Sequence, residues 1–600
     1  MSIRGAIMKD RFQDFPISHF FWIALGALTI AFHLWLIFSG LIPNLVSRPL
    51  HMALALPWAM VYISKTGFMR ISGAILAAIG IFSTLWIALN QSMLADQYGF
   101  ISSNFQIFIG ISLLVVVLEM ARRSIGWPLP LVALIALLYG LFGQYIPGEF
   151  GYSGIPIESF LGTLTIAEGG IWGKLTGISV SIVAIFVIFG AALNAGEAGQ
   201  GFMNIAAAAA GRLKGGAAKV SVISSALFGS ISGSASANVA STGAITLPAM
   251  TKLGYPRSLA GAVEAVASSG GQIMPPLMGA GAFIMVELTG VPYTGIMAAA
   301  LLPAILFFVA VWVGINAFSL RHELKGLPKD QQPKSKTIII TSAFFMLPFS
   351  VLLWGMFIGK YTPQYAASMA ILAASILLLF NAKLKIDRKQ FLYRLGQVCL
   401  NAGKQISMIA SIILCASIVI GILGITGLGV KITSLILSGS GGMLWPALLL
   451  TALACLILGM EVPTTAAYVI SVSIAGPALI ELGVEPLQAH LFIFWFALLS
   501  TITPPVCGAV FIAAGMVQEN WLKVAGSAMA LGLGLYLIPL GMIANPYLIQ
   551  LAEFPAFAIL SAIKVAVALT LISYAIIAPK PISLRISMII FGLGIMFISF

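Results

Sequence analysis

The stretch GSISGSASANVASTGAITLPAM at residues 229–250, followed by SSGGQIMPPLMGA at 268–280, has a second version later in the chain. The second version runs GMEVPTTAAYVISVSIAGPAL at 459–479 and LSTITPPVCGA at 499–509. Four residue pairs share one offset of 229 positions: Pro248 and Pro477, Gly254 and Gly483, Pro275 and Pro504, and Gly279 and Gly508. Coincidences at constant spacing indicate duplication, so the sequence predicts two structural repeats.

The composition around these repeats is that of a membrane protein. Hydrophobic residues make up 60% of 600 positions and charged residues 8%, and the mean hydropathy is +1.05. Apolar runs of about 17 to 25 residues, long enough to span a bilayer, recur from position 17 onward. We therefore expect an all-α polytopic membrane protein whose water-soluble partners are separate chains.

The charge and cysteine patterns exclude several other classes. The net charge of +13 lies in short loops, as in cytoplasmic loops facing anionic lipid, and does not indicate nucleic-acid binding. Cys399, Cys415, Cys455 and Cys507 stand singly in apolar segments, so neither a disulfide framework nor a transition-metal site is expected. The long first apolar run has no A-x-A-like cleavage site, which predicts an uncleaved span and a cytoplasmic N-terminus.

The chain divides into four expected parts. Residues 1–146 should form a compact four- or five-helix unit, with spans at 17–40, 50–64, 71–90, 104–121 and 128–146. An acidic stretch at 147–176 reads as an external loop. A region containing the repeats is expected over 177–545, with repeats at about 177–316 and 404–545, and C-terminal transmembrane helices over 546–600.

Each repeat is expected to contain a re-entrant helical hairpin, because 217–250 and 443–480 are too short for two full spans each. Five expected crossings separate the hairpins: 257–290 (broken at GGQIMPP), 294–316, 337–358, 364–380 and 404–424. An odd number of crossings inverts one repeat relative to the other. The loop charges agree, with Lys431 as the exception, although a double crossing by 257–290 would remove the parity argument. The basic stretch 381–403 is either an interfacial amphipathic helix or a plain loop.

Helix breaks in hydrocarbon persist only where protein, water or ligand pairs the freed backbone groups. Carbonyls beside Pro275, Pro276, Pro504 and Pro505 lose a helical donor and are expected to be free for a cation. Ten side chains near the breaks offer neutral oxygens that suit a hard monovalent cation: Ser232, Ser234, Ser236, Asn238, Thr242, Gln272, Thr464, Thr465, Thr501 and Thr503. Helix N-termini after each break suit a carboxylate substrate. The alternative is that the small residues, such as Gly229 and Gly233, only mediate close helix packing.

Ionisable residues at membrane depth are functional hypotheses by default. The candidates are Glu119, Glu264, Glu287, Glu461 and Lys564, of which Glu461 lies at the second hairpin tip. Glu119 lies beside two arginines and is expected only to end a helix, and His490 is expected to be a packing residue. No HExxH, GxSxG or P-loop motif occurs, so an enzyme is not expected.

The repeat motifs resemble one transporter family closely. Over roughly 180–545 the chain is similar to the large membrane subunit of tripartite ATP-independent periplasmic (TRAP) transporters. The similarity lies in ALFGSISGSASANVASTGAITLPAM, GYPRSLAGAVEAVASSGGQIMPPLMGAGAFIM, LGMEVPTTAAYVI and LSTITPPVCGAVFIAAGM. The helices in front look like a fused small subunit, the 4TM/12TM form associated with TAXI-type binding proteins, but they match only in size and helix count. The resemblance implies an inverted-repeat elevator transporter that is driven by sodium and fed by a periplasmic binding protein carrying an organic acid.

The resemblance also implies two sodium sites at the hairpin tips and the facing unwound turns. One would use Ser232, Ser234, Asn238, Gly270 and Gly271, and the other Gly459, Thr464, Thr465, Thr501 and Thr503. The substrate path would then run along Ser236, Thr242, Gln272, Pro275, Pro276, Pro504 and Pro505. No ligand role is assigned to Glu461, because Val-Pro displaces the threonines of the family's ETT pattern.

The leading hypothesis is therefore sodium-coupled uptake of a small carboxylate across a bacterial inner membrane, with no cofactor besides the coupling ion. A stand-alone exchanger that needs no binding protein is the main rival. A membrane scaffold or channel whose motifs serve only packing is the third.

Overall fold

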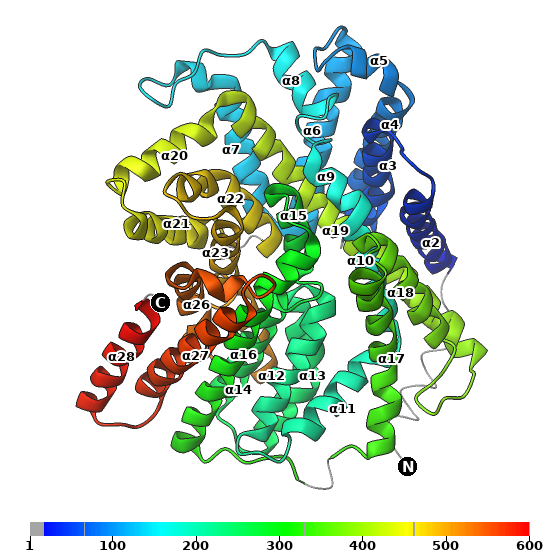
Figure 1. Ribbon diagram of the computed structural model, residues 1–600. Coiled ribbons are helices and arrows are strands. Elements are labelled where there is room, and N and C mark those ends of the chain that lie inside the picture. The colour runs from blue at the N-terminus through cyan, green and yellow to red at the C-terminus, as the bar shows by residue number, and fades with distance from the viewer. Residues whose placement is uncertain (1–16, 65, 329–331, 460–462, 506, 599–600) are drawn as a thin grey trace.

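The computed structural model describes residues 17–64, 66–328, 332–459, 463–505 and 507–598, with side chains from His19 on and without that of Ser232. The described residues form helices and turns, and one isolated bridge joins Phe380 and Ile386. Among these residues, eleven helices are long and apolar enough to cross a membrane. The expected all-α polytopic architecture is confirmed (Figure 1).

Five expected spans of the N-terminal unit are present. They are α2 (Ile17–Phe38), α3 (Asn44–Pro57) with a π-helical turn at Trp58–Tyr62, α4 (Gly67–Leu89), α6 (Asn104–Ile125) and α7 (Pro128–Phe142). Helix α4 packs on both α3 and α6, whereas α2 lies mainly against α19 (Arg388–Thr426). The N-terminal helices are therefore not one compact bundle, because the long α19 takes α2 as a neighbour.

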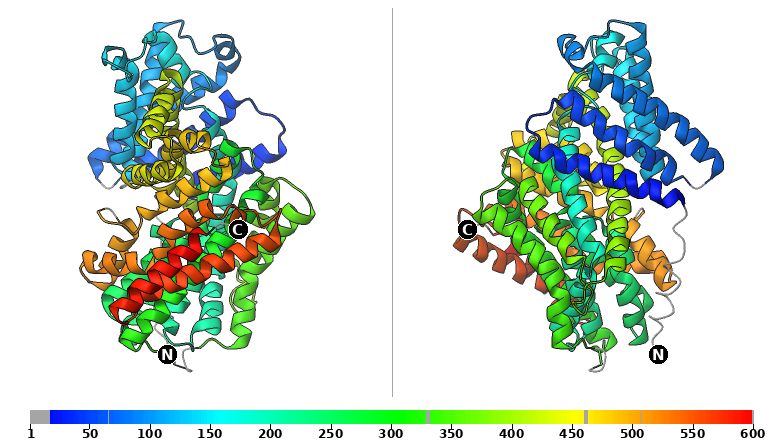
Figure 2. Two further views of the ribbon diagram at one scale, coloured as in Figure 1. Left: turned by 60° about the vertical axis from the view of Figure 1, so that its left-hand side comes forward. Right: turned by 90° about the vertical axis from the view of Figure 1, so that its right-hand side faces the viewer.

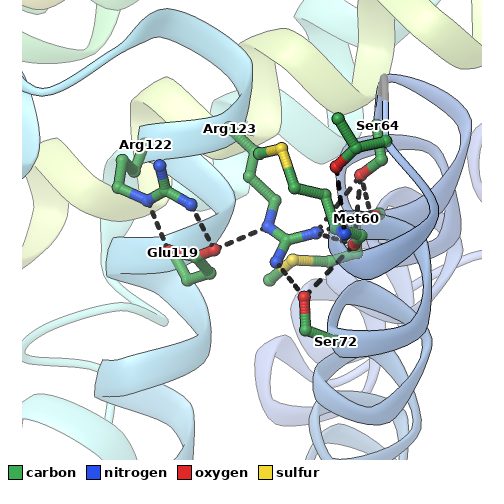
Figure 3. Close-up of polar contacts among 8 residues, drawn as sticks. Met60, Ser64, Ser72, Glu119, Arg122 and Arg123 are labelled. Carbon is green, nitrogen blue, oxygen red and sulfur yellow. Dashed lines mark hydrogen bonds and ion pairs between the residues drawn. The ribbon is translucent and has the colours of Figure 1, made fainter.

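Figure 3 shows how the last turn of α6 holds α3 and α4. Glu119 accepts hydrogen bonds of 2.6 Å from the Nε atoms of Arg122 and Arg123. Arg123 also donates to the Met60 carbonyl at 3.0 Å and to Ser72 Oγ at 3.0 Å. The arginine thus pairs a backbone carbonyl in the π-helical turn, where regular helical bonding changes. Glu119 orients this arginine and belongs to the helix end, as expected.

The acidic stretch 147–176 contains more structure than the expected loop. It includes α8 (Ile157–Thr165), with Phe160 and Leu164 buried. Buried Trp172 donates from Nε1 to the Thr165 carbonyl at 2.7 Å, and Arg48 of α3 lies 3.5 Å from Glu168. The charges of this stretch alone predicted a loop. Its apolar side chains, spaced four residues apart, place one helix face in the core.

The basic stretch 381–403 is helical from Arg388 on, so it is not a plain loop, and the helix runs directly into the following span. Residues 388–403 are the first part of α19, whose 39 residues extend about 58 Å at 1.5 Å per residue. The Asp387 side chain caps its start by accepting from the Gln390 N–H at 3.0 Å. Farther along, the backbone at Gly403 lies against the Trp58 ring, and Ser407 donates to the Ala55 carbonyl at 2.7 Å. The basic end stays helical because α19 packs against the N-terminal unit on one side and α10 (Ala184–Ala195) on another.

Most remaining spans lie close to where they were expected. They are the span 174–195 ending in α10, α16 (Tyr293–His322), α17 (Ser335–Leu353), α18 (Pro363–Leu377), α27 (Pro555–Ile577) and α28 (Ile582–Phe597). The expected span 522–544 is two helices, α25 (Trp521–Leu531) and α26 (Leu533–Ala544), which meet at Gly532. Besides α8, three described helices were not anticipated: α5 (Gln91–Asp96), α11 (Ala198–Ala210) and α20 (Leu428–Gly439).

The repeats lie in the body of the molecule beyond the N-terminal helices. In Figure 1 the blue and cyan helices occupy the upper part, the teal and green helices of the first repeat the lower part, and α15, α22 and α23 the middle. Helices α27 and α28 pair with each other, and α27 packs on α16 (Figure 2). This arrangement surrounds the repeat helices with other helices on several sides.

Candidate functional site

The two repeats contain corresponding sets of four helices, and the middle two of each set have matching boundaries. The first contains α12 (Gly216–Ser232), α13 (Ala235–Lys252), α14 (Arg257–Gly270) and α15 (Gly279–Thr289). The second contains α21 (Leu444–Leu458), α22 (Thr464–Glu481), α23 (Pro486–Leu499) and α24 (Gly508–Val517). Adding 229 to the bounds of α13 and α14 gives those of α22 and α23. Both Pro-Pro bonds, Pro275–Pro276 and Pro504–Pro505, are cis. The predicted duplication is therefore present in the fold.

The first hairpin turns tightly against the break between α14 and α15. Gly233 ends α12 in the left-handed conformation at φ 59°, and Ser234 caps α13 by accepting from the Ala237 N–H at 3.3 Å. A Cβ built on Gly233 would lie 2.6 Å from Gly279 Cα, and one on Gly229 would overlap Gly271 Cα. These glycines therefore do serve close packing, and that packing brings the hairpin tip onto the broken helix.

A buried polar cluster lies below this tip. Asn238 is fully buried and donates from Nδ2 to the Ser225 carbonyl at 2.9 Å, so α13 is fastened to α12. Thr242 Oγ1 lies one turn further along, 2.8 Å from the Asn238 carbonyl and 3.2 Å from Asn238 Oδ1. Thr242 also contacts a carboxylate oxygen of Glu264 on α14. The predicted residues Asn238 and Thr242 are thus together, in a site that is richer than the sequence indicated.

Polar side chains join the two repeats across the molecule. Thr464, at the start of α22, donates to Gln272 Oε1 at 3.0 Å, and Gln272 donates from Nε2 to the Gly233 carbonyl at 3.0 Å. Thr501, after α23, donates to Ser269 Oγ of α14 at 2.8 Å. The tip of the second hairpin is therefore connected to the break in the first repeat, and that break is connected to the tip of the first hairpin.

Other predicted residues take separate places. Thr503 Oγ1 lies 2.7 Å from the Tyr536 hydroxyl of α26, and with Pro504 and Pro505 it lines a cavity of about 200 Å³ beside α21. Gly459 approaches Ser500, and Thr465 is half-buried on the first turn of α22. Ser236 is exposed. Glu461 lies outside the described residues, as does the side chain of Ser232.

One expectation about free carbonyls is wrong for the first break. The Tyr293 hydroxyl of α16 donates to the Pro276 carbonyl and lies 3.4 Å from the Leu277 carbonyl. The sequence predicted a carbonyl here without a helical donor, and the hydroxyl of a tyrosine 17 residues later pairs with it. The sequence could not reveal this contact, because a buried tyrosine finds its partner only through packing.

Sequence reasoning named Glu264 without giving it a role, and it missed the residues that surround it. Ser221 donates to Glu264 Oε2 at 2.8 Å, Ser268 donates to Oε1 at 3.3 Å, and Thr246 also contacts Oε2. A signal was present, because Glu264 and Ser268 are four apart and share one face of α14. His490, by contrast, is a packing residue as expected, with Nδ1 2.8 Å from the Tyr468 hydroxyl.

Comparisons with known proteins identify the family. A model described as "Tripartite ATP-independent periplasmic transporter, DctM component" matches residues 112–557. The C4-dicarboxylate TRAP transporter large permease protein DctM of Pseudomonas aeruginosa is 25% identical over 337 residues, covering 56% of this chain and 76% of the relative.

Two further relatives carry different substrates in their names. The isethionate TRAP transporter permease protein DctMQ of Oleidesulfovibrio alaskensis is 26% identical over 422 residues, 67% of this chain and 64% of the relative. The 2,3-diketo-L-gulonate TRAP transporter large permease protein YiaN of Escherichia coli is 25% identical over 348 residues, 57% of this chain and 79% of the relative. Because the family model matches most of its length, the chain belongs to the DctM component family of tripartite ATP-independent periplasmic transporters, which are multi-pass membrane permeases.

Proposed function

We propose that this chain carries a small organic acid across the bacterial inner membrane together with sodium, after a periplasmic binding protein delivers the acid. The observation that carries the proposal is the polar connection between the repeats, from Thr464 through Gln272 to the Gly233 carbonyl. Side chains from both hairpins and a helix break meet there, as at the midplane sites of inverted-repeat transporters. An inverted arrangement of the repeats and a cytoplasmic N-terminus belong to the same proposal.

The chemistry of the described residues fits a hard monovalent cation. Asn238, Thr242, Thr464 and Thr501 supply neutral amide and hydroxyl oxygens, the kind of ligand that such cations prefer. The hairpin tip residues Ser234, Gly270, Gly271, Gly459 and Thr465 remain predicted sodium ligands. Thr503 is the weakest member of this set, because its hydroxyl pairs with Tyr536.

A small anion is the proposed substrate. The N-termini of α13 and α22 follow the hairpin tips and present backbone N–H groups and positive dipole ends toward the breaks. The names of the relatives give C4-dicarboxylate, isethionate and 2,3-diketo-L-gulonate, which are all small organic anions. Ser236, near the start of α13, and the two Pro-Pro segments remain the proposed substrate path.

The proposed movement is an elevator displacement of the repeat helices against a scaffold. The scaffold would comprise the N-terminal unit with α19 and the remaining spans, including α27 and α28. Arg123 joins α6 to α3 and α4, and Ser407 joins α19 to α3, which gives this part a continuous frame. A TAXI-type binding protein is the expected partner.

Uptake into proteoliposomes tests the function. The full chain would be reconstituted with a secreted TAXI-type binding protein, and uptake of labelled C4-dicarboxylates and other small organic acids would be measured with and without a sodium gradient. We expect accumulation that requires both the binding protein and sodium. Asn238→Ala and Thr503→Ala should lose the sodium dependence, whereas Thr570→Ala on the distant α27 should keep it.

The rivals give different results in this assay. Full-rate uptake without the binding protein would favour a stand-alone exchanger. Absence of saturable accumulation against a gradient would favour a channel or scaffold. Unchanged sodium-driven uptake in both Asn238→Ala and Thr503→Ala would overturn the proposed site.

A further inference from the structure

Glu264 is a fully buried carboxylate in the middle of the first repeat. Its two oxygens contact four hydroxyl groups: Oε1 those of Thr242 and Ser268, and Oε2 those of Ser221 and Thr246. An ionised carboxylate has about four lone-pair positions and can accept from all four donors. The surroundings therefore suit a negative charge at this position.

No cation of the protein balances that charge within the described residues. None of the ion pairs found there includes Glu264. The nearest helices carry few basic groups, and Lys219 of α12 lies with its Nζ 4.8 Å from the centre of the Trp312 ring. Lys252, Arg257 and Lys523 lie toward the ends of α13, α14 and α25. A buried charge without a counter-charge is costly, so a bound cation would stabilise it.

The oxygens on one side of Glu264 have the spacing of ligands around a small cation. Thr242 Oγ1 lies 3.3 Å from Ser225 Oγ and 3.2 Å from Asn238 Oδ1. Ser268 Oγ lies 3.5 Å from Ser225 Oγ and 3.3 Å from Glu264 Oε1. Two oxygens at right angles, each about 2.4 Å from a hard cation, would lie about 3.4 Å apart.

The backbone of α13 packs closely on the Glu264 side chain. Gly243 faces Glu264, and a Cβ built on it would lie 3.2 Å from the glutamate Cγ. Asn238 Nδ2 is already engaged with the Ser225 carbonyl, which turns its Oδ1 toward Thr242. The amide and the carboxylate thus present oxygens to the same small space from α13 and α14.

We infer that Glu264 is the anionic ligand of a sodium site formed with Ser225, Asn238, Thr242 and Ser268. This site lies below the hairpin tip. It shares Asn238 with the first predicted sodium site and adds ligands from α12 and α14. The inference rests on the proposed sodium coupling. The Glu264 carboxylate supplies a negative charge, so the site in the first repeat would bind a monovalent cation rather than a neutral species.

Sodium-dependent thermal stability of the purified full chain tests the inference. The unfolding midpoint would be measured against rising sodium chloride, with choline chloride holding the ionic strength constant. Ligand binding to the folded state raises the midpoint, and the rise grows with the logarithm of the ligand concentration above the dissociation constant. We expect the unfolding midpoint of the wild type to rise specifically with sodium. Glu264→Gln should lose this rise or should need at least about tenfold more sodium to reach it.

Matched variants separate ligation from general damage. Glu287→Gln makes the same change on α15 of the same repeat, where the carboxylate is at the surface 4.0 Å from Lys174, and should keep the wild-type response. Glu264→Asp keeps the charge and should restore part of the response. Should Glu264→Gln not purify as folded protein, Ser225→Ala and Ser268→Ala each remove one neutral ligand and should weaken direct binding of radioactive sodium.

The outcomes distinguish this inference from the proposed function. An equal sodium response in Glu264→Gln and the wild type, with sodium-driven uptake intact, overturns the site and leaves the function standing. A wild type without a sodium response or sodium-driven uptake overturns both. A wild-type midpoint that depends on pH through Glu264 but not on sodium assigns the carboxylate to protons and also overturns the site.

Discussion

The two repeats share the boundaries of their middle helices but not their polar chemistry. The positions of Ser225, Asn238, Glu264 and Ser268 in the first repeat are occupied in the second by Ala454, Ala467, Ile493 and Ala497. The position of Gln272 is taken by Thr501 in the second repeat. Gln272 bonds to Thr464 of the second repeat, and Thr501 bonds to Ser269 of the first. Duplication thus preserved the helix pattern, while the buried carboxylate and most of its hydroxyl partners occur in one copy. Of the partners, only Thr242 has a hydroxyl counterpart at the offset of 229, which is Ser471.

This difference shows which features the fold itself requires. The helix breaks and the Pro-Pro segments occur in both repeats, so the backbone geometry depends on them. The carboxylate cluster occurs in one repeat, so the fold of such a repeat does not need it. A buried carboxylate that is dispensable for the fold is a stronger functional candidate than one that the architecture demands.

Filling the closest contact of the first hairpin should have the largest effect. The matching contact in the second repeat, Gly459 against Ser500, also uses a glycine, and Gly229→Leu would drive a side chain into the Gly271 backbone. We expect destabilisation of about 3 kcal/mol or more, because overpacking against backbone cannot be relieved by a rotamer change. Loss of a monodisperse peak in size-exclusion chromatography and a lower thermal midpoint would report it.

Gly515→Ala is the control for that change, because a Cβ there meets nothing within 4 Å. A Gly229→Leu protein as stable as Gly515→Ala would mean that the hairpin does not sit on the break as described.

Removing the amide that fastens the first hairpin should have the next largest effect. Asn238→Ala installs the residue found at the matching position of the second repeat and leaves the Ser225 carbonyl without its side-chain donor. We expect a loss of about 1 to 3 kcal/mol in unfolding free energy, together with loss of sodium-dependent stabilisation. Thermal unfolding in sodium and in choline chloride measures both.

The reverse change supplies the contrast. Ala467→Asn in the second repeat should not create a sodium response, because Ile493 occupies the position that matches Glu264. A new sodium response there would contradict the assignment of the charge to the first repeat.

The bond between the repeats should give a moderate and measurable coupling. Thr501→Val and Ser269→Ala each remove one side of the 2.8 Å hydrogen bond between α14 and the segment after α23. A double-mutant cycle should give a coupling of about 0.5 to 1.5 kcal/mol in unfolding free energy. Additive effects of the two changes would mean that the repeats are not joined through this pair.

The smallest stability effect is expected at the matching positions Ser236 and Thr465. Ser236 is exposed and Thr465 half-buried, so Ser236→Ala and Thr465→Val should each change the unfolding free energy by less than about 0.5 kcal/mol. If these residues line the substrate or ion path, the concentration dependence of uptake should nevertheless change. Wild-type uptake kinetics in both variants would remove them from the proposed site.

Most of the helices could be predicted from the sequence, because a membrane span has a nearly fixed length and an apolar composition. The exceptions have particular causes. Helix α8 was hidden by the acidic residues around it, and the first half of α19 was hidden by its basic ones. Both are helical because tertiary contacts, such as Trp172 with Thr165 and Gly403 with Trp58, bury faces that local composition does not mark.

The sequence by itself determined the duplication, the membrane class, the helix breaks and most of the residues near them. These follow from local chemistry, since proline and glycine interrupt helices wherever they occur in such patterns. Only the tertiary structure decided which polar groups meet: Tyr293 on the Pro276 carbonyl, Thr464 on Gln272, and four hydroxyls around Glu264. Those contacts join residues between 4 and 192 positions apart, and the packing of helices sets the partners of most of them.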